Sequence, residues 1–248
     1  MTAIRIPPVN HRCPGGDSSA SPPTVSAVAD PPWLLHGEGM LARVAGRPDR
    51  PVTLPPGLVA LPGPAAVVVM RYDDTPVGPY SELSVAVPAR LGLRPGLCTV
   101  AMVVTSSDAL VECRRSWGLP AELGNLVWSR DPGSDGGRAV AWEERGLVFT
   151  ARAFGPSVLA PFVPVRSVAW RPSGAVVLAR RLRARVRLAW CRIELGADDD
   201  QSWLAGRHLG MDLAGARIVA QPARRPAGLL SSVPWRERPS GTAPEPAA

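Results

Sequence analysis

Residues 181–188 run Arg-Leu-Arg-Ala-Arg-Val-Arg-Leu, and no other stretch of the chain indicates its local structure as clearly. Side chains on a β-strand point to opposite faces with a period of two. One face of this segment therefore carries four arginines, and the other carries Leu182, Ala184, Val186 and Leu188. A row of arginines can form an anion-binding or nucleic-acid surface, but it is more often the solvated face of a half-buried strand.

Further strands are predicted on both sides of this segment. Residues 65–70 and 97–104 are short continuous apolar runs, which are typical of buried strands. Residues 140–153 predict a hairpin, with the turn at Glu143-Glu144-Arg145-Gly146.

Only two segments favour helices. The first is 111–123, which Gly118 and Pro120 interrupt. The second is 201–208, which follows an acidic triplet at 198–200 that would cap its first turn.

Composition supports a fold made mainly of strands. The chain has 248 residues, with 29 prolines and 24 glycines, too many for a helical bundle. We predict a β-rich α+β domain over residues 31–222. The segments 1–30 and 223–248 are rich in proline and poor in large apolar residues, so we expect both tails to be disordered.

All 28 basic side chains are arginine, so the chain contains no lysine. Arginine stays protonated and cannot supply the neutral amine that attacks a carbonyl group. The formal net charge of +7 is weak support for nucleic-acid binding, because several arginines lie in the tails.

The four cysteines, Cys13, Cys98, Cys113 and Cys191, are widely spaced and form no CxxC pair. We therefore expect buried thiols, with no metal site and no disulfide framework. The chain also has no apolar run of signal-peptide or membrane-span length, and no phosphate-binding loop. These features predict a cytoplasmic protein without a membrane segment and without a cofactor.

Four blocks of sequence resemble a known family. They are Pro-Trp-Leu-Leu-His at 32–36, Gly-Pro-Tyr-Ser-Glu-Leu at 78–83, the segment ALVECRRSWGLPAELG at 109–124, and a weaker match at 209–219. In their order and spacing they resemble acetoacetate decarboxylase and its relatives. The resemblance implies an antiparallel β-cone or barrel with few short helices and an internal pocket.

The resemblance also shows where the family's chemistry is missing. In that family, a lysine in a Pro-Lys-Lys-Leu-Gly segment forms an imine with the substrate, and the next lysine lowers its pKa. The matching segment here is Pro-Ala-Glu-Leu-Gly at 120–124. Ala121 stands at the position of the nucleophile and Glu122 at that of the tuning cation, so Schiff-base decarboxylation is excluded.

Other family positions are partly kept. Glu82 matches the pocket glutamate, and Arg114 matches an arginine upstream of the lysine. The second glutamate of the family aligns with Val67. The arginine that holds the substrate carboxylate aligns with Glu38.

The residues themselves also indicate a site. Tyr80 and Glu82 lie at the predicted entrance of a strand, and Arg114, Arg115 and Trp117 form a cationic and aromatic cluster. A carboxylate, a guanidinium and an aromatic wall suit a small polar or anionic ligand. A structural ion pair between Glu82 and Arg114 explains the same residues equally well.

Three functions follow, in this order. The first is a pseudoenzyme that binds a small polar or carboxylate-bearing molecule, with Ala121 and Glu122 also lining the pocket. The second is a lyase or hydratase acting on a small oxo acid, with Glu82 as acid or base and Arg114 or Arg115 as anion holder. The third, well behind, is nucleic-acid or partner binding through the arginines of 181–187. We expect a homo-oligomer in each case.

Overall fold

The arginine-alternating segment lies within a long strand, β10, as its period of two predicts. The computed structural model describes residues 30–46, 52–130, 137–196 and 201–225. In chain order its elements are β1 (Trp33–Val44), β2 (Leu58–Ala60), β3 (Ala65–Asp74), β4 (Tyr80–Leu91), β5 (Arg94–Val104), α1 (Ser107–Glu112), the π-helical turn η1 (Cys113–Trp117), β6 (Ala121–Leu123), β7 (Leu126–Arg130), β8 (Arg138–Trp142), the 3₁₀ turn η2 (Glu143–Arg145), β9 (Leu147–Arg171), β10 (Gly174–Glu194), the 3₁₀ turn η3 (Ser202–Leu204) and β11 (Gly206–Ala220). The predicted mainly-β class is confirmed.

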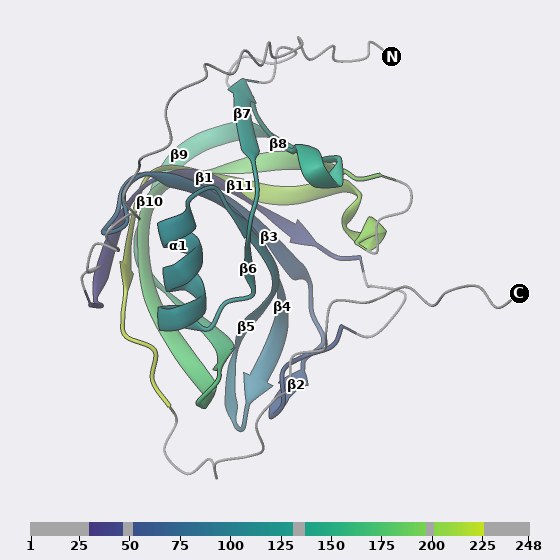
Figure 1. Cartoon of the computed structure of the whole chain (residues 1–248). Helices are drawn as coiled ribbons and strands as arrows, with labels where there is room; N and C mark the ends of the chain where they lie inside the picture. Colours follow the sequence, from purple (N-terminus) through teal and green to yellow (C-terminus); the bar gives the residue numbers. More distant parts are fainter. Residues whose placement is uncertain (1–29, 47–51, 131–136, 197–200, 226–248) are drawn as a thin grey trace, which may run out of the picture.

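The strands form one sheet that closes on itself. Its order is β6-β5-β4-β3-β1-β11-β10-β9-β8-β7, and β2 pairs with β4. The sheet closes because β9, besides pairing with β8 and β10, also pairs with β5. This pairing is parallel, with Leu97↔Ser167 and Cys98↔Val168 as partners. Because β5–β6 is also parallel, the sheet is mixed rather than wholly antiparallel. Figure 1 shows α1 lying inside the curve of strands that includes β10, β5 and β4.

Two core clusters lie on opposite faces of this sheet. Successive residues of one strand belong alternately to the two clusters. In β5, Met102 and Val104 belong to the cluster that also contains residues of α1, whereas Val103 belongs to the other cluster. The α1 side holds the aromatic residues Trp33, Tyr72, Tyr80 and Trp117. The opposite cluster is mostly aliphatic around Phe149 and Trp142, and residues of β7 and β8 belong to it. The alternation of the strands thus builds a polar-aromatic interior and a separate apolar core.

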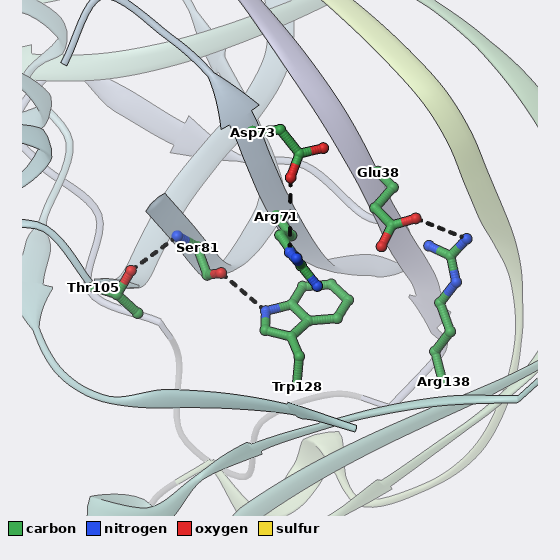
Figure 2. Close-up of polar contacts among 7 residues, drawn as sticks. All are labelled: Glu38, Arg71, Asp73, Ser81, Thr105, Trp128 and Arg138. Carbon is green, nitrogen blue, oxygen red and sulfur yellow. Dashed lines mark hydrogen bonds and ion pairs between the residues drawn. The ribbon is translucent and has the colours of Figure 1, made fainter. Parts of the chain in front are cut away.

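Polar contacts fasten the β7–β8 hairpin across the sheet (Figure 2). The indole Nε1 of Trp128 donates to the Ser81 hydroxyl at 3.0 Å, which ties β7 to β4. Arg138 of β8 forms ion pairs with Glu38 of β1 at 3.2 Å and with Asp212 of β11 at 3.4 Å. These contacts hold the hairpin over the face opposite α1.

The local predictions succeed unevenly. The hairpin at 140–153 is confirmed as β8, η2 and β9. The helix predicted at 111–123 begins earlier, at Ser107, and its helical turns end at Trp117 because Gly118 adopts φ +65. The helix predicted at 201–208 is wrong. Only η3 forms there, since the chain from Gly206 pairs with β10 as a strand.

The alternation in β10 also ends sooner than predicted. Leu182 and Val186 pack against the α1-side core and Ala184 is buried in it, but Leu188 is 49% exposed. Between Val186 and Leu188 the register with β9 shifts, and beyond it the buried residues are Ala189, Cys191 and Ile193 on the other face. The strand therefore changes the face that it buries part-way along.

The predicted tails, 1–30 and 223–248, lie almost wholly outside the described residues. The ordered chain nevertheless continues past residue 222. Arg224 exchanges two backbone hydrogen bonds with Val177 of β10, and Ala223 packs against the α1-side core. Within the described ranges, no helix is long and apolar enough to cross a membrane.

Candidate functional site

A small cavity lies on the α1 side of the sheet, where Glu82 is buried. Its volume is about 20 Å³, which is enough for roughly one water molecule. Strands β1, β3, β4, β10 and β11 and the turn η1 supply most of its wall. The lining residues are Trp33, Leu35, Tyr72, Tyr80, Glu82, Cys113, Trp117, Leu119, Arg180 and Ala220.

Strand register places Glu82 between two tyrosines. Tyr72 of β3 pairs with Tyr80 of β4, and Glu82 follows Tyr80 by two positions on the same face. The Tyr72 hydroxyl donates to Glu82 Oε1 at 3.1 Å, and the Tyr80 hydroxyl lies 3.5 Å from Oε2. The two rings pack at 4.9 Å between centroids. Both oxygens of the carboxyl therefore face hydroxyl donors.

Burial raises the pKa of the Glu82 carboxyl, because a charge in the interior loses its hydration. The nearby positive charge of Arg180 and the two tyrosine hydrogen bonds act in the opposite direction, but more weakly than burial. Burial, and then the charge of Glu82, also raise the pKa of both tyrosines well above the usual range. The Glu82 carboxyl thus holds its proton more strongly than an exposed glutamate does.

Arg180 enters this cavity from β10. It lies on the same face as Leu178 and Leu182, and its Nε is buried without a hydrogen-bond partner among the described residues. It was not among the residues predicted from the sequence. The signal was present, since Arg180 is the one charge on the apolar face of Val176, Leu178, Leu182 and Ala184. A charge on the buried side of an alternating strand is costly without a partner.

The turn η1 supplies the remaining wall. A π-helical turn inserts an extra residue and re-aims side chains, and such turns are frequent at functional sites. Here it directs Cys113 and Trp117 into the cavity, and Trp117 packs edge-on against Trp33 at 5.5 Å. Burial, followed by the charge of Glu82, raises the pKa of the Cys113 thiol to about 12. Cys113 is therefore a neutral wall group and not a nucleophile at neutral pH.

Comparison with known proteins shows what the chain is similar to. Residues 46–161 match the family model "Acetoacetate decarboxylase (ADC)". Among solved structures, the enduracididine biosynthesis enzyme MppR complexed with pyruvate superposes with a TM-score of 0.59 at 18% identity, covering 79% of this chain and 92% of that chain. Residues 46–161, a little under half of the chain, are thus similar to the acetoacetate decarboxylase family, and the fold is that of acetoacetate decarboxylase-like proteins.

Two further solved structures share the fold. Acetoacetate decarboxylase from Legionella pneumophila gives a TM-score of 0.59 at 15% identity, covering 83% of this chain and 92% of that one. An acetoacetate decarboxylase-like enzyme from Sphingomonas wittichii gives 0.56 at 18% identity, covering 85% and 97%. Among curated proteins, none is similar to this chain in sequence.

The acetoacetate decarboxylase-like fold brings together only some of the predicted site residues. Glu82, Tyr80 and Trp117 line the cavity. Ala121 is buried in the same core cluster, paired with Met102, but it is not one of the ten lining residues.

The cations and Glu122 lie elsewhere. Arg114 is exposed, and its Nε donates to the carbonyl of Ala121 at 2.8 Å. Arg115 is also exposed, and it pairs with the buried carboxylate of Glu112 at 2.6 Å. Glu122 is half-exposed and lies 3.6 Å from Arg145. The structure thus gives Arg114 a backbone partner in place of the predicted ion pair with Glu82.

Two family positions lie on the other face of the sheet from Glu82. Val67 is fully buried in the aliphatic core and offers no charged group to a ligand. Glu38 forms its ion pair with Arg138 (Figure 2). Within the described ranges, no three His, Cys, Asp or Glu side chains gather closely enough to hold a metal ion.

Proposed function

We propose that this domain binds a small carboxylate-bearing organic molecule in the Glu82–Arg180 cavity and does not form an imine. The observation that carries the proposal is the buried, unpartnered Nε of Arg180 on the wall that Glu82 shares. A guanidinium matches a carboxylate in shape and charge, and a protonated Glu82 can donate the further hydrogen bond. Pyruvate, which the related enzyme MppR binds, has the required carboxylate and a neighbouring carbonyl oxygen.

The volume of the cavity sets a condition on this proposal. At about 20 Å³ it admits one water molecule, so the wall has to move outward for a ligand to enter. We expect η1, with Cys113 and Trp117, to make that movement, because it is a short turn between α1 and β6.

The test compares two adjacent arginines. Arg180 lines the cavity, and its neighbour Arg181 is exposed on the opposite face of β10. Pyruvate should raise the melting temperature of the wild type and of Arg181→Gln, and the shift should disappear in Arg180→Gln. A shift that survives in Arg180→Gln, or is absent from the wild type, would refute the proposal.

A second candidate is a lysine-independent lyase or hydratase acting on a small oxo acid. The raised pKa of Glu82 favours it, since a general acid is more effective when its pKa lies closer to the working pH than that of an exposed carboxyl. Exchange of the pyruvate methyl protons in deuterated water would detect such chemistry. It should require Glu82 and be lost in Glu82→Gln, even where pyruvate still binds. No exchange above the uncatalysed rate would favour the pseudoenzyme.

We also keep the prediction of a homo-oligomer in the cytoplasm. An exposed apolar patch supports a second copy of this chain as partner. Leu188 and Trp190 of β10 pair with Met211 and Leu209 of β11, and all four are exposed. Patches of this kind mark protein interfaces. Light scattering should give an oligomer for the wild type and a smaller species for Trp190→Glu, whereas a monomeric wild type would refute this.

A further inference from the structure

A second hollow lies beside Arg183 and Arg185, on the face of β10 opposite Leu182 and Val186, which pack against the α1-side core. Its volume is about 340 Å³, within the range of small-molecule sites. Strands β9, β10 and β11 form it, and its lining residues are Leu159, Arg183, Ala184, Arg185, Ala214, Gly215 and Arg217. We call it the arginine groove. It lies on the arginine-bearing face of β10, but it is not a flat row of charges.

The sheet register brings three arginines to this groove. Arg183 of β10 pairs directly with Arg217 of β11, so two like charges stand opposite each other. Such a pair destabilises a sheet unless something neutralises it. Between Arg183 and Arg185 the register with β11 shifts by one residue, and Gly215 adopts φ +55 in the bulge. The bulge bends the sheet next to the Arg183–Arg217 pair.

The neighbouring groups leave this charge unbalanced. Within the described residues, none of the three groove arginines has an ion pair to an acid. On the next strand, β1, the cross-strand partner of Arg217 is His36, which is not an acid. Asp212 is the cross-strand partner of Arg187, but it already forms an ion pair with Arg138. His36 pairs in turn with Asp74 of β3, so that acid lies two strands away from Arg217.

Apolar groups complete one side of the groove. Leu159 of β9 is the cross-strand partner of Arg185, and the Arg183 guanidinium lies 5.9 Å from the centre of the Phe162 ring. A stacked guanidinium is held in place, which lowers the entropy lost when it binds a ligand. The groove thus has three cations beside an apolar wall.

We propose that the arginine groove binds a small organic phosphate, with the phosphate between Arg183 and Arg217 and the organic part against Leu159. Arginine forks match phosphate oxygens in pairs, and a dianion balances the facing charges of Arg183 and Arg217. A monocarboxylate would neutralise only one of them. This inference is independent of the function proposed for the Glu82 cavity.

The experiment is calorimetry on the full chain at constant ionic strength, with phenyl phosphate, inorganic phosphate and benzoate as probes. Phenyl phosphate should bind more tightly than inorganic phosphate, which lacks the apolar part, and than benzoate, which lacks the second charge. The variants Arg183→Gln and Arg217→Gln should each weaken phenyl phosphate on the order of 10-fold. Leu159→Ser should weaken phenyl phosphate but leave inorganic phosphate unchanged.

Two controls locate the binding. Arg43→Gln removes an exposed strand arginine outside the groove, and Arg180→Gln removes the arginine of the internal cavity. Both should bind phenyl phosphate as the wild type does. Without ligand, Arg217→Gln should keep or raise the melting temperature, because it removes the repulsion with Arg183. If Arg217 served only to stabilise the fold, Arg217→Gln would have a lower melting temperature than the wild type.

Several results would overturn the proposal. One is benzoate binding to Arg180→Gln, in which the internal cavity is disabled, as tightly as phenyl phosphate does, and another is a loss of phenyl phosphate binding in Arg180→Gln instead of the groove variants. A third is the absence of saturable phenyl phosphate binding up to millimolar concentration. A single-stranded oligonucleotide that binds tightly, and that phenyl phosphate does not displace, would assign the surface to nucleic acid instead.

Discussion

Gly118 follows the cavity residue Trp117 and allows a direct test of how η1 is held. Its φ is +65, in the left-handed region, and it ends the helical turns. A Cβ at this position would lie 2.4 Å from the Trp170 carbonyl oxygen and 2.8 Å from Arg171 Cγ. Gly146 is a matched control, since it also ends a turn with φ +59 but has nothing within 4 Å of its Cβ position.

The two alanine variants should therefore differ by the close contact alone. Both incur the left-handed penalty of roughly 1–2 kcal/mol, partly offset by the lower entropy of the unfolded chain. Gly118→Ala incurs a further ~1–3 kcal/mol because Trp170 has to move. At roughly 2–4 °C per kcal/mol for a domain of this size, its melting temperature should lie about 2–12 °C below that of Gly146→Ala.

Calorimetric melting of both purified variants would measure this difference. Equal melting temperatures would show that the backbone around Trp170 yields without cost. The close packing of η1 against β9 would then be refuted. A folded Gly118→Ala with normal pyruvate binding would also contradict the role given to Trp117 in the cavity wall.

Three further predictions concern the chemistry of the cavity. Borohydride treatment with pyruvate or acetoacetate should leave no adduct on any internal peptide of the wild type, because the chain has no lysine; an internal mass increase would contradict this. Borohydride should trap an imine with pyruvate to the same extent in Ala121→Lys and in Ala121→Lys/Glu122→Gln, because Glu122 lies beside Arg145 and not in the cavity. A larger amount of trapped imine in the double variant would place Glu122 in the site. Because Glu82 has a raised pKa, the folded state holds its proton to higher pH than the unfolded chain does. The free energy of unfolding should thus fall as pH rises above the usual glutamate range, by about 1.4 kcal/mol for each tenfold difference in proton affinity between the folded and unfolded states. Urea titrations of Glu82→Gln should lack this part of the decline, and an unchanged profile would show that Glu82 ionises normally.

The sequence predicts strands where side-chain period is strong. The alternation of 181–188 and the apolar run at 65–70 both lie in strands, because local pattern and tertiary burial agree there. The helix predicted at 201–208 is wrong because its acidic cap is only a local signal. Pairing with β10 places the residues from Gly206 in a strand, and no local signal contains that pairing.

The site was predicted only in part, for a related reason. Glu82 and Tyr80 lie two apart on one strand, so their shared face follows from the sequence. Arg180 reaches the same cavity from a strand about a hundred residues later, and only the closed sheet brings the two together. Arg114 and Arg115 were assigned from their closeness to Trp117 along the chain, and Arg114 also from the family resemblance. A π-helical turn directs neighbouring side chains in different directions, and these two point outward.

Arg180 also bears on what this cavity can bind in a chain that has no lysine. If Glu82 and Arg180 served only the fold, a direct ion pair or two apolar residues of similar volume would stabilise the domain better. In the structure the Glu82 oxygens face Tyr72 and Tyr80 instead, and the buried Nε of Arg180 has no partner among the described residues. A buried guanidinium nitrogen without a partner destabilises the folded protein. Its placement beside Glu82 is the reason for proposing a ligand that supplies the missing negative charge, which a carboxylate would do without any covalent bond to the protein.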